Sequence, residues 1–321
     1  MSVLTLNKIK RIPRRAVQKI DSGLKLKWSR WQLSMYEHVP SILYLEVTNK
    51  CNANCVFCGR SDVHKPLMHM DFDMFKAIVD AAPYTTQVHT QGFGEPLLYP
   101  HLIDAIKYCK ERNKRVVFYT NASLLEEEMA IDLLETKVDQ IRFSVDEITA
   151  NLFEPLRRGL SWKVVLKNIE NFQYQKSKGG YKTETIARVT KTKENKDRLY
   201  EITKFWSTRV DIAVVAPEFD VIPYAENAAC QYTTTHPNQF ECNNPYEQFA
   251  VRSNGDVILC CVDWFHNYVI DNISKGPITQ DRILKIFNSE RYNSLRDGME
   301  TGINCPTRCL SCKGIVAPKR D

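Results

Sequence analysis

The sequence reads Cys51-Asn52-Ala53-Asn54-Cys55-Val56-Phe57-Cys58 directly after an apolar run at 42–48. A loop with this cysteine spacing can wrap three thiolates around three irons of a cubane and leave the fourth iron without a protein ligand. Most four-cysteine sites for zinc or for electron transfer instead close every position. The segment therefore predicts an iron–sulfur centre with one iron open to a substrate or cofactor.

A structural zinc knuckle, with His64 as the fourth ligand, is the alternative interpretation of the same three cysteines. It is disfavoured because it leaves two further observations unexplained. One is the regular order of strands and helices along the chain. The other is the set of motifs that follow the later strands.

Short apolar and β-branched runs alternate with amphipathic segments from Ser41 onward, which is typical of parallel strands joined by crossover helices. Strands are predicted at 42–48, 87–91, 115–120, 139–145, 184–190 and 211–215. Helices are predicted at 71–82, 100–112, 124–136, 161–177 and 195–207. The fourth helix has Ser161 as its expected N-cap. Six βα units are too few for a closed barrel, so we expect an α/β fold with an open, partial (βα)6 barrel of parallel strands, whose functional residues lie at the carboxyl ends of the strands.

Three parts are expected along the chain: a basic arm at 1–40, the partial barrel at 41–235, and a small cysteine-rich domain at 236–321. The alternation of strands and helices stops after Ala216, where a loop-rich stretch begins. A hairpin turn is predicted further on, at Ser253-Asn254-Gly255-Asp256.

The composition, with 43% hydrophobic and 26% charged residues, is that of an ordinary soluble globular protein. No stretch approaches the roughly 20 apolar residues that span a bilayer, and the N-terminus does not resemble a secretory signal. A cytoplasmic location is therefore expected. In a reducing compartment, eleven cysteines indicate metal binding more than disulfides.

Charge is concentrated in the first 40 residues, where nine Lys or Arg face two acidic residues in a chain of net charge +6. This arm predicts binding to an anionic membrane surface or an acidic partner. A solvated leader is the alternative. A non-enzymatic zinc or iron–sulfur protein that binds nucleic acid is disfavoured because charges balance after residue 40, so no nucleic acid is expected.

The second predicted strand ends in Gln91-Gly92-Phe93-Gly94-Glu95-Pro96. Together with the three-cysteine segment and the aromatic Phe57 before its last cysteine, this resembles the radical S-adenosylmethionine (SAM) superfamily. The resemblance implies a catalytic 4Fe-4S cluster on Cys51, Cys55 and Cys58, whose open iron is chelated by the amino and carboxylate groups of SAM. It also implies reductive cleavage of SAM to methionine and a 5′-deoxyadenosyl radical.

The resemblance further assigns the residues that contact the cofactors: Phe57, Gly94, Glu95, Asn121, Ser144, Asp146 and Arg157. Gly94 and Glu95 match the family's GGEP motif, in which Phe93 here replaces a glycine. Thr120-Asn121-Ala122 and Ser144-Val145-Asp146 are similar to the family's TNG and SxD positions, and Arg157 to an arginine that pairs with the SAM carboxylate. The alternative for Asn121 and Ser144 is that they cap helices. The alternative for Arg157 is that its side chain is exposed to solvent.

Cys242 and Cys260 are spaced like the opening of the SPASM and twitch auxiliary-cluster domains. With Cys309 and Cys312 they make a complete set for one auxiliary 4Fe-4S cluster. A structural zinc ribbon is the alternative. Adjacent residues of a strand point to opposite faces, so Cys261 is not expected to share the cluster with Cys260. The cysteines left without a cluster are Cys230, Cys261 and Cys305, and Cys109, which is expected in the core because it lies at helical spacing from Leu102 and Ile106.

A single auxiliary cluster resembles the short form of the family. We therefore expect a radical SAM oxidoreductase that abstracts hydrogen from a small molecule: a sugar, aminocyclitol or similar metabolite, for dehydrogenation or epimerisation. In an epimerase, Cys230 or Cys261 is a candidate hydrogen donor. Modification of a ribosomal peptide or protein is the alternative, weakened because about 40 residues before the first strand are too few for a folded recognition domain. The expected electron donor is a flavodoxin or a ferredoxin-type protein.

Overall fold

The computed structural model describes residues 33–60, 66–216, 242–261, 263 and 268–301. Its strands are β1 (Ile42–Leu45), β2 (Asn54–Cys55), β3 (Gln87–Thr90), β4 (Arg115–Thr120), β5 (Gln140–Ser144), β6 (Arg157–Arg158), β7 (Glu184–Thr190), β8 (Ile212–Ala216), β9 (Gln248–Val251), β10 (Asp256–Ile258) and β11 (Val269–Asn272). Its helices are α3 (Phe72–Ala81), α4 (Leu102–Glu111), α5 (Glu127–Glu135), α6 (Ala150–Leu156), α7 (Trp162–Lys178), α8 (Leu199–Ser207), α9 (Asn244–Glu247), α10 (Gln280–Phe287) and α11 (Glu290–Thr301), with 3-10 turns η1 (Pro96–Leu98) and η2 (Ile273–Lys275). In these ranges no helix has the length and apolar character needed to cross a membrane.

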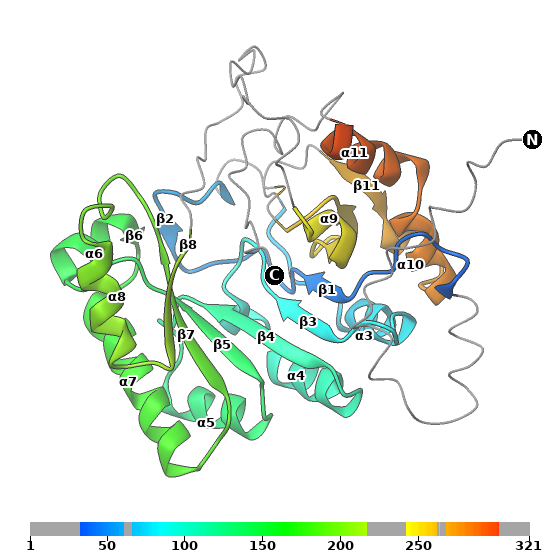
Figure 1. Ribbon diagram of the computed structural model, residues 1–321. Helices are drawn as coiled ribbons and strands as arrows, with labels where there is room; N and C mark the ends of the chain where they lie inside the picture. The colour runs from blue at the N-terminus through cyan, green and yellow to red at the C-terminus, as the bar shows by residue number, and fades with distance from the viewer. Residues whose placement is uncertain (1–32, 61–65, 217–241, 262, 264–267, 302–321) are drawn as a thin grey trace, which may run out of the picture.

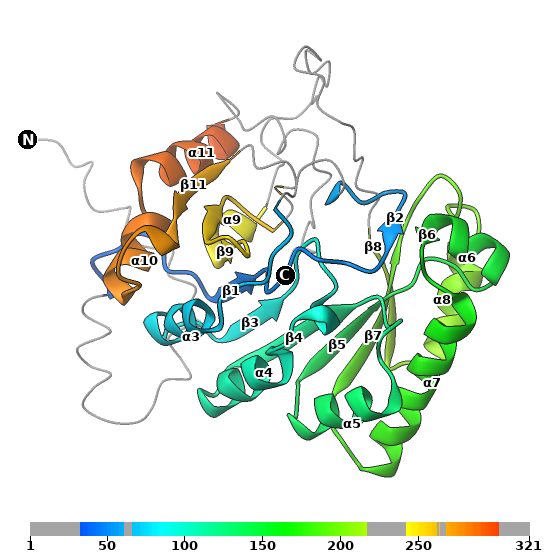
Figure 2. The same cartoon turned by 180° about the vertical axis from the view of Figure 1, so that it is seen from behind.

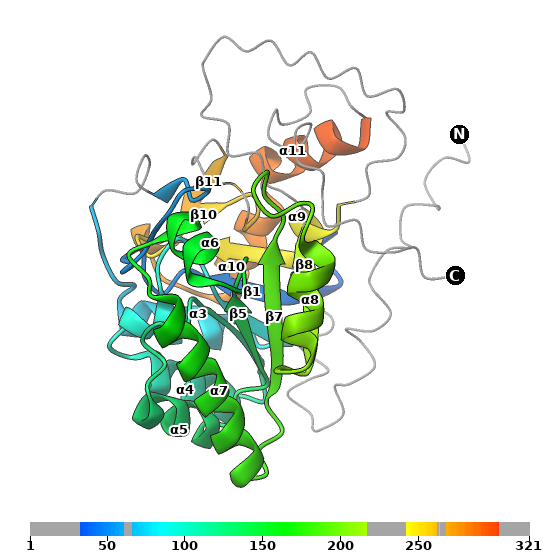
Figure 3. The same ribbon diagram turned by 90° about the vertical axis from the view of Figure 1, so that its left-hand side faces the viewer.

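One nine-stranded sheet organises the chain, in the order β11-β10-β9-β1-β3-β4-β5-β7-β8. Every neighbouring pair from β9 to β8 is parallel, whereas β9, β10 and β11 pair antiparallel. Figure 3 looks onto the edge formed by β7 and β8. The six strands predicted from the sequence are β1, β3, β4, β5, β7 and β8, so the predicted α/β fold with a parallel, partial barrel is confirmed.

Helices α3, α4, α5 and α7 run along the outside of this curved sheet (Figures 1 and 2). The strand residues that face them are apolar and fully buried, among them Leu43, Val88, Phe118 and Phe143. Phe143 of β5 packs edge-to-face on Phe172 of α7, with ring centroids 5.8 Å apart. Burying a side chain of this size contributes about 2 kcal/mol, so this layer stabilises the fold substantially.

The opposite, inner face of the sheet is polar. Because successive side chains of a strand alternate between faces, the residues between the apolar ones share this inner face: Tyr44, His89, Tyr119, Arg142 and Arg188. Parallel strands that are covered on both faces normally read as continuous apolar runs. The polar inner face therefore borders a site rather than a second hydrophobic core.

The C-terminal hairpin extends the same sheet. Strands β9 and β10 pair antiparallel around Gly255, whose φ of 86° lies in the left-handed region that favours glycine, and this confirms the predicted turn. Strand β9 pairs in parallel with β1, with Ile42 opposite Gln248. Phe249 and Phe287 join Leu43 in one continuous core, so the barrel strands and the C-terminal elements pack together.

Candidate active site

The three cysteines of the first motif lie in the connection between β1 and α3. Cys55 belongs to β2, which pairs antiparallel with β6; the two strands are labelled in Figure 1. This pairing places Cys55 opposite Arg157. The amide of Cys58 donates to the carbonyl of Cys55 at 3.0 Å, and the amide of Ala53 donates to Cys51 Sγ at 3.4 Å. All three thiols are free and half-buried. The predicted ligands thus lie together in one short segment, 51–58, the cysteine turn.

Three thiols in one connection are the kind of donor set that an iron–sulfur cubane uses. Among the residues that the structure describes, no three His, Cys, Asp or Glu side chains converge as ligands of one ion, whereas a cubane distributes its thiolates over separate irons. Burial raises the pKa of Cys51 to about 11, opposed by the amide of Ala53. Burial likewise raises the pKa of Cys55 and of Cys58. Ligation to iron therefore has to release thiol protons.

Arg157 is the cation that contacts the cysteine turn. Its Nη1 lies 3.8 Å from Cys55 Sγ, and its guanidinium carbon lies 5.3 Å from the centroid of the Phe57 ring. Its Nε and Nη2 donate to Oδ2 of Asp146 at 2.7 and 2.6 Å. Arg157 is 5% exposed and Asp146 is 0% exposed. The alternative of a solvated arginine is therefore wrong. In this structure Arg157 forms its ion pair with a carboxylate of the protein, Asp146.

Asp146 also joins β5 to β7. Its Oδ1 accepts from the amide of Thr190 at 2.7 Å, and its carbonyl accepts from Asn195 Nδ2 at 3.0 Å. Ser144, two residues earlier, is half-buried and lies opposite Arg188 of β7. The SxD motif therefore places one residue, Asp146, in a buried network and the other, Ser144, on the accessible inner face.

The loop after β3 lies directly against the cysteine turn. The amide of Glu95 donates to the carbonyl of Lys50 at 2.8 Å. A Cβ at Gly94 would collide with the carbonyl oxygens of Thr48 and Lys50, so only glycine allows this close approach. In the protein, Gly94 thus serves a contact between two loops of the chain itself.

The carboxylate of Glu95 holds the end of β3 to the end of β4. It accepts from the amide of Asn121 at 2.7 Å, the hydroxyl of Thr120 at 2.8 Å and the amide of Leu97 at 3.1 Å. Glu95 is 2% exposed. Burial raises its pKa to about 7, while the three hydrogen bonds act in the opposite direction. Glu95 is therefore placed to fix loop geometry.

Asn121 connects β4 to the cysteine turn through Asn52, a residue that the sequence reasoning missed. Asn121 Nδ2 donates to Asn52 Oδ1 at 3.0 Å, and Asn52 Nδ2 donates to Ser123 Oγ at 2.8 Å. Neither Asn121 nor Ser144 is a helix cap, because α5 and α6 begin elsewhere. The one available signal for Asn52 was its place between two of the cysteines.

Two of the four expected auxiliary ligands, Cys242 and Cys260, lie in the described residues; the former is half-buried and the latter is 7% exposed. Strand β10 ends at Ile258, so the expectation that Cys260 and Cys261 are neighbours on a strand is wrong. Cys261 packs beside Tyr44, and the thiol hydrogen-bonds to the Tyr44 hydroxyl. The predicted residues that fall outside the described ranges are His64, Cys230, Cys305, Cys309 and Cys312.

Polar contacts continue across the inner face, next to this site. Tyr44 donates a hydrogen bond to Gln91, and Arg142 Nη1 donates to the Tyr119 hydroxyl at 2.5 Å. The guanidinium carbon of Arg188 lies 5.9 Å from the centroid of the Tyr119 ring. The sequence reasoning did not select these residues, although their alternation with apolar residues in the strands was a usable signal.

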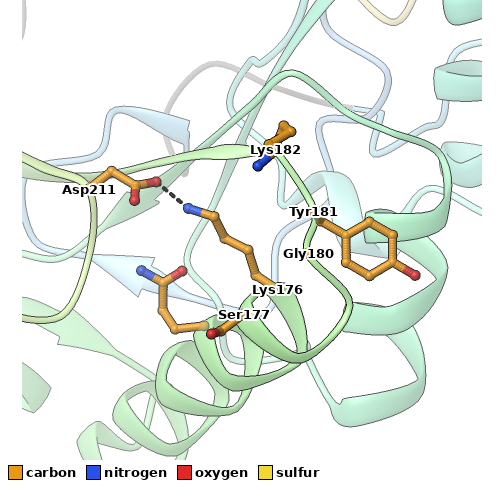
Figure 4. Close-up of a pocket in the computed structure, with 7 residues that line it drawn as sticks. Lys176, Ser177, Gly180, Tyr181, Lys182 and Asp211 are labelled. Atoms are coloured by element: carbon orange, nitrogen blue, oxygen red, sulfur yellow. Dashed lines mark hydrogen bonds and ion pairs between the residues drawn. The ribbon is translucent and has the colours of Figure 1, made fainter.

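A separate hollow lies at the other end of the sheet (Figure 4). It is lined by Gln173, Lys176, Ser177, Gly180, Tyr181, Lys182 and Asp211. An ion pair joins Lys176 to Asp211. Lys182 and Asp211 precede β7 and β8, whereas the cysteine turn follows the carboxyl end of β1, so this hollow is not part of the candidate active site.

These features define a class: an α/β enzyme built on a partial parallel barrel, with a three-cysteine turn at the carboxyl edge of its sheet. The chain matches the model of the radical SAM superfamily over residues 45–205, and that of an iron–sulfur cluster-binding domain, SPASM, over residues 242–313. It belongs to the radical SAM superfamily and carries a SPASM domain. Radical SAM enzymes use a 4Fe-4S cluster and SAM, and the SPASM domain adds an auxiliary iron–sulfur cluster.

A similar protein is the tungsten-containing aldehyde ferredoxin oxidoreductase cofactor-modifying protein of Pyrococcus furiosus, 26% identical over 294 residues that cover 79% of this chain and 82% of the relative. Several other curated relatives are matched over less than half of their length. Among solved structures, SuiB of Streptococcus suis has a TM-score of 0.66 at 18% identity, covering 93% of this chain and 79% of SuiB. The enzyme anSMEcpe with bound AdoMet and Cp18Cys peptide has a TM-score of 0.61 at 16% identity, covering 85% and 86%.

The predicted family, enzyme class and cofactors are thereby confirmed. The expectation of a sugar or aminocyclitol substrate gains no support from these relatives. The radical SAM match shows the chemistry that the family performs, and the substrate requires a separate argument.

Proposed function

We propose that Cys51, Cys55 and Cys58 hold the 4Fe-4S cluster and that its fourth iron binds SAM. When bound, the cluster supplies the electron that cleaves SAM to methionine and a 5′-deoxyadenosyl radical. The protein then has to hold the substrate on the inner face of the sheet, where a hydrogen atom is removed from it. In this proposal the chain orients both reactants and excludes water from them.

One observation carries this assignment: the cysteine turn is fastened to the ends of three consecutive barrel strands. Gly94 and Glu95 hold it to the end of β3, and Asn121 reaches it from the end of β4. Arg157, paired with Asp146 beyond β5, touches Cys55 itself. Such fixed ligands suit a cluster whose open iron must face one point on the sheet.

The roles of single residues follow from these contacts. Arg157 places a permanent positive charge beside Cys55, which favours the thiolate form that binds iron. Its expected contact with the SAM carboxylate remains part of the proposal, next to its ion pair with Asp146. Phe57 covers the guanidinium, and the half-buried Ser144 hydroxyl faces the inner side, where SAM is expected.

For the C-terminal part, we propose that Cys242 and Cys260 hold the auxiliary cluster together with Cys309 and Cys312. The SPASM match supports this set because it spans all four positions. The boundaries at 41–235 and 236–321, the flavodoxin or ferredoxin-type donor, and the role of the arm at 1–40 in binding a membrane surface or acidic partner stay predictions.

For the substrate, we propose a cofactor or its precursor. The supporting observation is the Pyrococcus relative, whose name describes a cofactor-modifying protein and which matches this chain over about four fifths of both lengths. Peptide modification, the alternative foreseen from the sequence, has less support, because the peptide-bound solved structures of SuiB and anSMEcpe share with this chain the fold alone.

The test is SAM cleavage by anaerobically reconstituted protein with dithionite, followed as 5′-deoxyadenosine by chromatography. Cys58→Ala is expected to abolish the product, because the cluster loses one of its three ligands. Cys109→Ala is the matched control: Cys109 is fully buried in α4, within the hydrophobic core, and its variant should retain the product. Product formation by the Cys58 variant at the wild-type rate contradicts the proposal.

A further inference from the structure

We propose that Arg142 and Arg188 form an anion-binding site on the inner face of the sheet and that the substrate carries a phosphate or carboxylate group which binds there. This inference rests on the proposed function, which places the substrate on that face. It adds the charge and the anchoring group of the substrate. It also gives a binding role to Arg142 and Arg188, which belong to none of the sequence motifs.

The two arginines lie on neighbouring strands and on the same face. Arg142 of β5 is opposite Ile186 of β7, and Arg188 is opposite Ser144, so the arginines are offset by two residues. With strands about 4.8 Å apart and about 3.3 Å of rise per residue, their Cα atoms are about 8 Å apart. Both guanidinium carbons approach the Tyr119 ring, at 5.0 and 5.9 Å from its centroid. Two long side chains at this spacing can reach one oxyanion.

The positive charge of this pair is not neutralised within the described chain. Four other arginines around the inner face and its rim do have carboxylate partners: Arg115 with Glu184, Arg157 with Asp146, Arg198 with Glu147, and Arg252 with Glu46. In the described ranges, no carboxylate oxygen lies within 4.0 Å of Arg142 or Arg188. The bonds that Arg142 makes go to neutral groups, Gln140 Oε1 at 2.6 Å and the Tyr119 hydroxyl.

Half-buried cations without a counter-charge are costly, and an anion that pairs with them offsets that cost. Arginine suits this task because its planar guanidinium presents paired donors that match phosphate and carboxylate oxygens. The Tyr119 hydroxyl accepts from Arg142 and therefore keeps its own proton for donation to the same anion. The site thus offers the guanidinium of Arg188, the remaining N–H groups of Arg142 and one hydroxyl to a single oxyanion.

One member of the pair, Arg142, also acts on the neighbouring His89. Burial, and next to it the charges of Arg142 and Arg115, lower the pKa of His89 to about 3. His89 is therefore neutral at physiological pH and adds no charge of its own. Arginine side chains, unlike histidine, keep their positive charge throughout the physiological pH range.

The placement also fits the chemistry. Along β5, Arg142 precedes Ser144 by two residues and Asp146 by four, and Asp146 is paired with the arginine that touches Cys55. A substrate anchored by its anion at Arg142 and Arg188 would therefore extend from the floor of the barrel toward the cysteine turn. Its reactive carbon lies between the anchor and the radical source.

The test uses full-length, anaerobically reconstituted protein in phosphate-free buffer, with inorganic phosphate as the probe and calorimetry as the readout. Arg142→Gln and Arg188→Gln are each expected to weaken phosphate binding by about tenfold or more, the usual effect of removing a charged hydrogen-bonding partner. Arg209→Gln is the control that removes the same charge from a half-buried arginine paired with Glu170 on the helical side. Its phosphate affinity should equal that of the wild type.

Iron content and melting temperature show whether each variant is folded. Where a glutamine variant loses iron, the corresponding lysine variant is measured instead. Lysine keeps the positive charge but lacks the paired N–H donors of the guanidinium, so an intermediate loss of phosphate affinity is expected. Equal phosphate affinity in wild type and both variants overturns the inference. So does weakened SAM binding with unchanged phosphate binding, because the arginines would then bind the SAM carboxylate.

Failure of the proposed function is recognised separately, by 5′-deoxyadenosine formation in the same samples. If phosphate binding depends on both arginines and no SAM is cleaved, the anion site stands and the proposed function fails. If SAM is cleaved and phosphate affinity is unchanged in both arginine variants, the proposed function stands and the anion site fails.

Discussion

Arg157 contacts an ion-pair partner, a cysteine and an aromatic ring at once, and its own side chain and that of Asp146 are buried. The cost of burying its charge is met by Asp146, which accepts two hydrogen bonds from it. A buried pair of this kind contributes little net stability, but removing one partner leaves the other charge uncompensated. Arg157 therefore couples stability to the geometry of the cysteine turn.

Arg157→Met is expected to destabilise the protein by about 3–5 kcal/mol, because Asp146 then remains buried and charged. The double variant Asp146→Asn, Arg157→Met should recover much of that loss, since neither charge remains. SAM cleavage should stay low in both, because both lack the cation at Cys55. Urea unfolding under anaerobic conditions measures the first effect and 5′-deoxyadenosine formation the second. Recovery of activity along with stability would show that Arg157 acts on structure alone.

His89 gives a prediction for pH. Its pKa is lowered to about 3, first by burial and then by the positive charges of Arg142 and Arg115. An unfolded histidine has a pKa of about 6.5. Between these values the unfolded chain binds more protons, so the free energy of unfolding rises with pH through this window. His89→Gln is expected to flatten that rise, seen as a smaller difference between urea midpoints at about pH 5 and about pH 7. His101→Gln, at an exposed turn, is the control, and an unchanged slope in the His89 variant contradicts the prediction.

Single residues divide into those that the sequence could indicate and those that it could not. The cysteines were found because metal ligation fixes their spacing. Arg142 and Arg188 were missed because a polar residue that alternates with apolar ones looks the same whether it faces solvent or a site. Only the pairing of β5 with β7 brings the two together.

Elements were predictable where a local pattern fixes them. Strands β4 and β7 have the predicted bounds, and α3 differs by one residue at each end. Helix α6 was missed because it is short and contains Pro155, which is a helix breaker in sequence patterns. The pairing of β9 with β1 was missed for another reason: it joins residues about 200 apart, and no local pattern encodes such a contact.

Helix capping gives a prediction at this scale. Asp71 caps α3, and its Oδ1 accepts from the amide of Met74 at 2.8 Å. Asp71→Ala is expected to lower the free energy of unfolding by about 1 kcal/mol, because an N-terminal amide loses its partner. Ser161 occupies the predicted cap position of α7 but its side chain makes no capping bond. Ser161→Ala should therefore have a smaller effect in the same urea titration, and equal losses would contradict the assignment.

At the scale of the molecule, the barrel and the C-terminal hairpin form one structure. Glu46, just beyond β1, accepts from Arg252 Nη1 at 2.9 Å and from Ser253 Oγ at 3.0 Å, and also from the amide of Phe93 at 3.0 Å. Glu46 and Arg252 are 3% and 4% exposed. One buried ion pair thus ties the loop beside the cysteine turn to the hairpin that carries Cys260, so the two expected clusters share a rigid frame.

The two sets of cysteines predict how much iron the protein binds. If both cysteine sets hold cubanes, the reconstituted protein contains about eight irons per chain, four from each cluster. The variant with alanine at Cys51, Cys55 and Cys58 should retain about half of the iron and lose SAM cleavage, because the auxiliary set is intact. The complementary variant replaces Cys242, Cys260, Cys309 and Cys312 and should also retain about half.

Metal analysis and Mössbauer spectroscopy of both variants measure these outcomes. The two clusters should differ in their response to SAM, since only a cluster with an open iron can bind it. SAM should therefore change the spectrum of the variant that keeps the cysteine turn and leave the other unchanged. Stoichiometric zinc without iron in the variant lacking the first three cysteines would show that the C-terminal set is a structural zinc ribbon. If the iron instead depends on Cys261 and not on Cys260, the auxiliary cluster is real but its ligand set is different, and the thiol beside Tyr44 belongs to it.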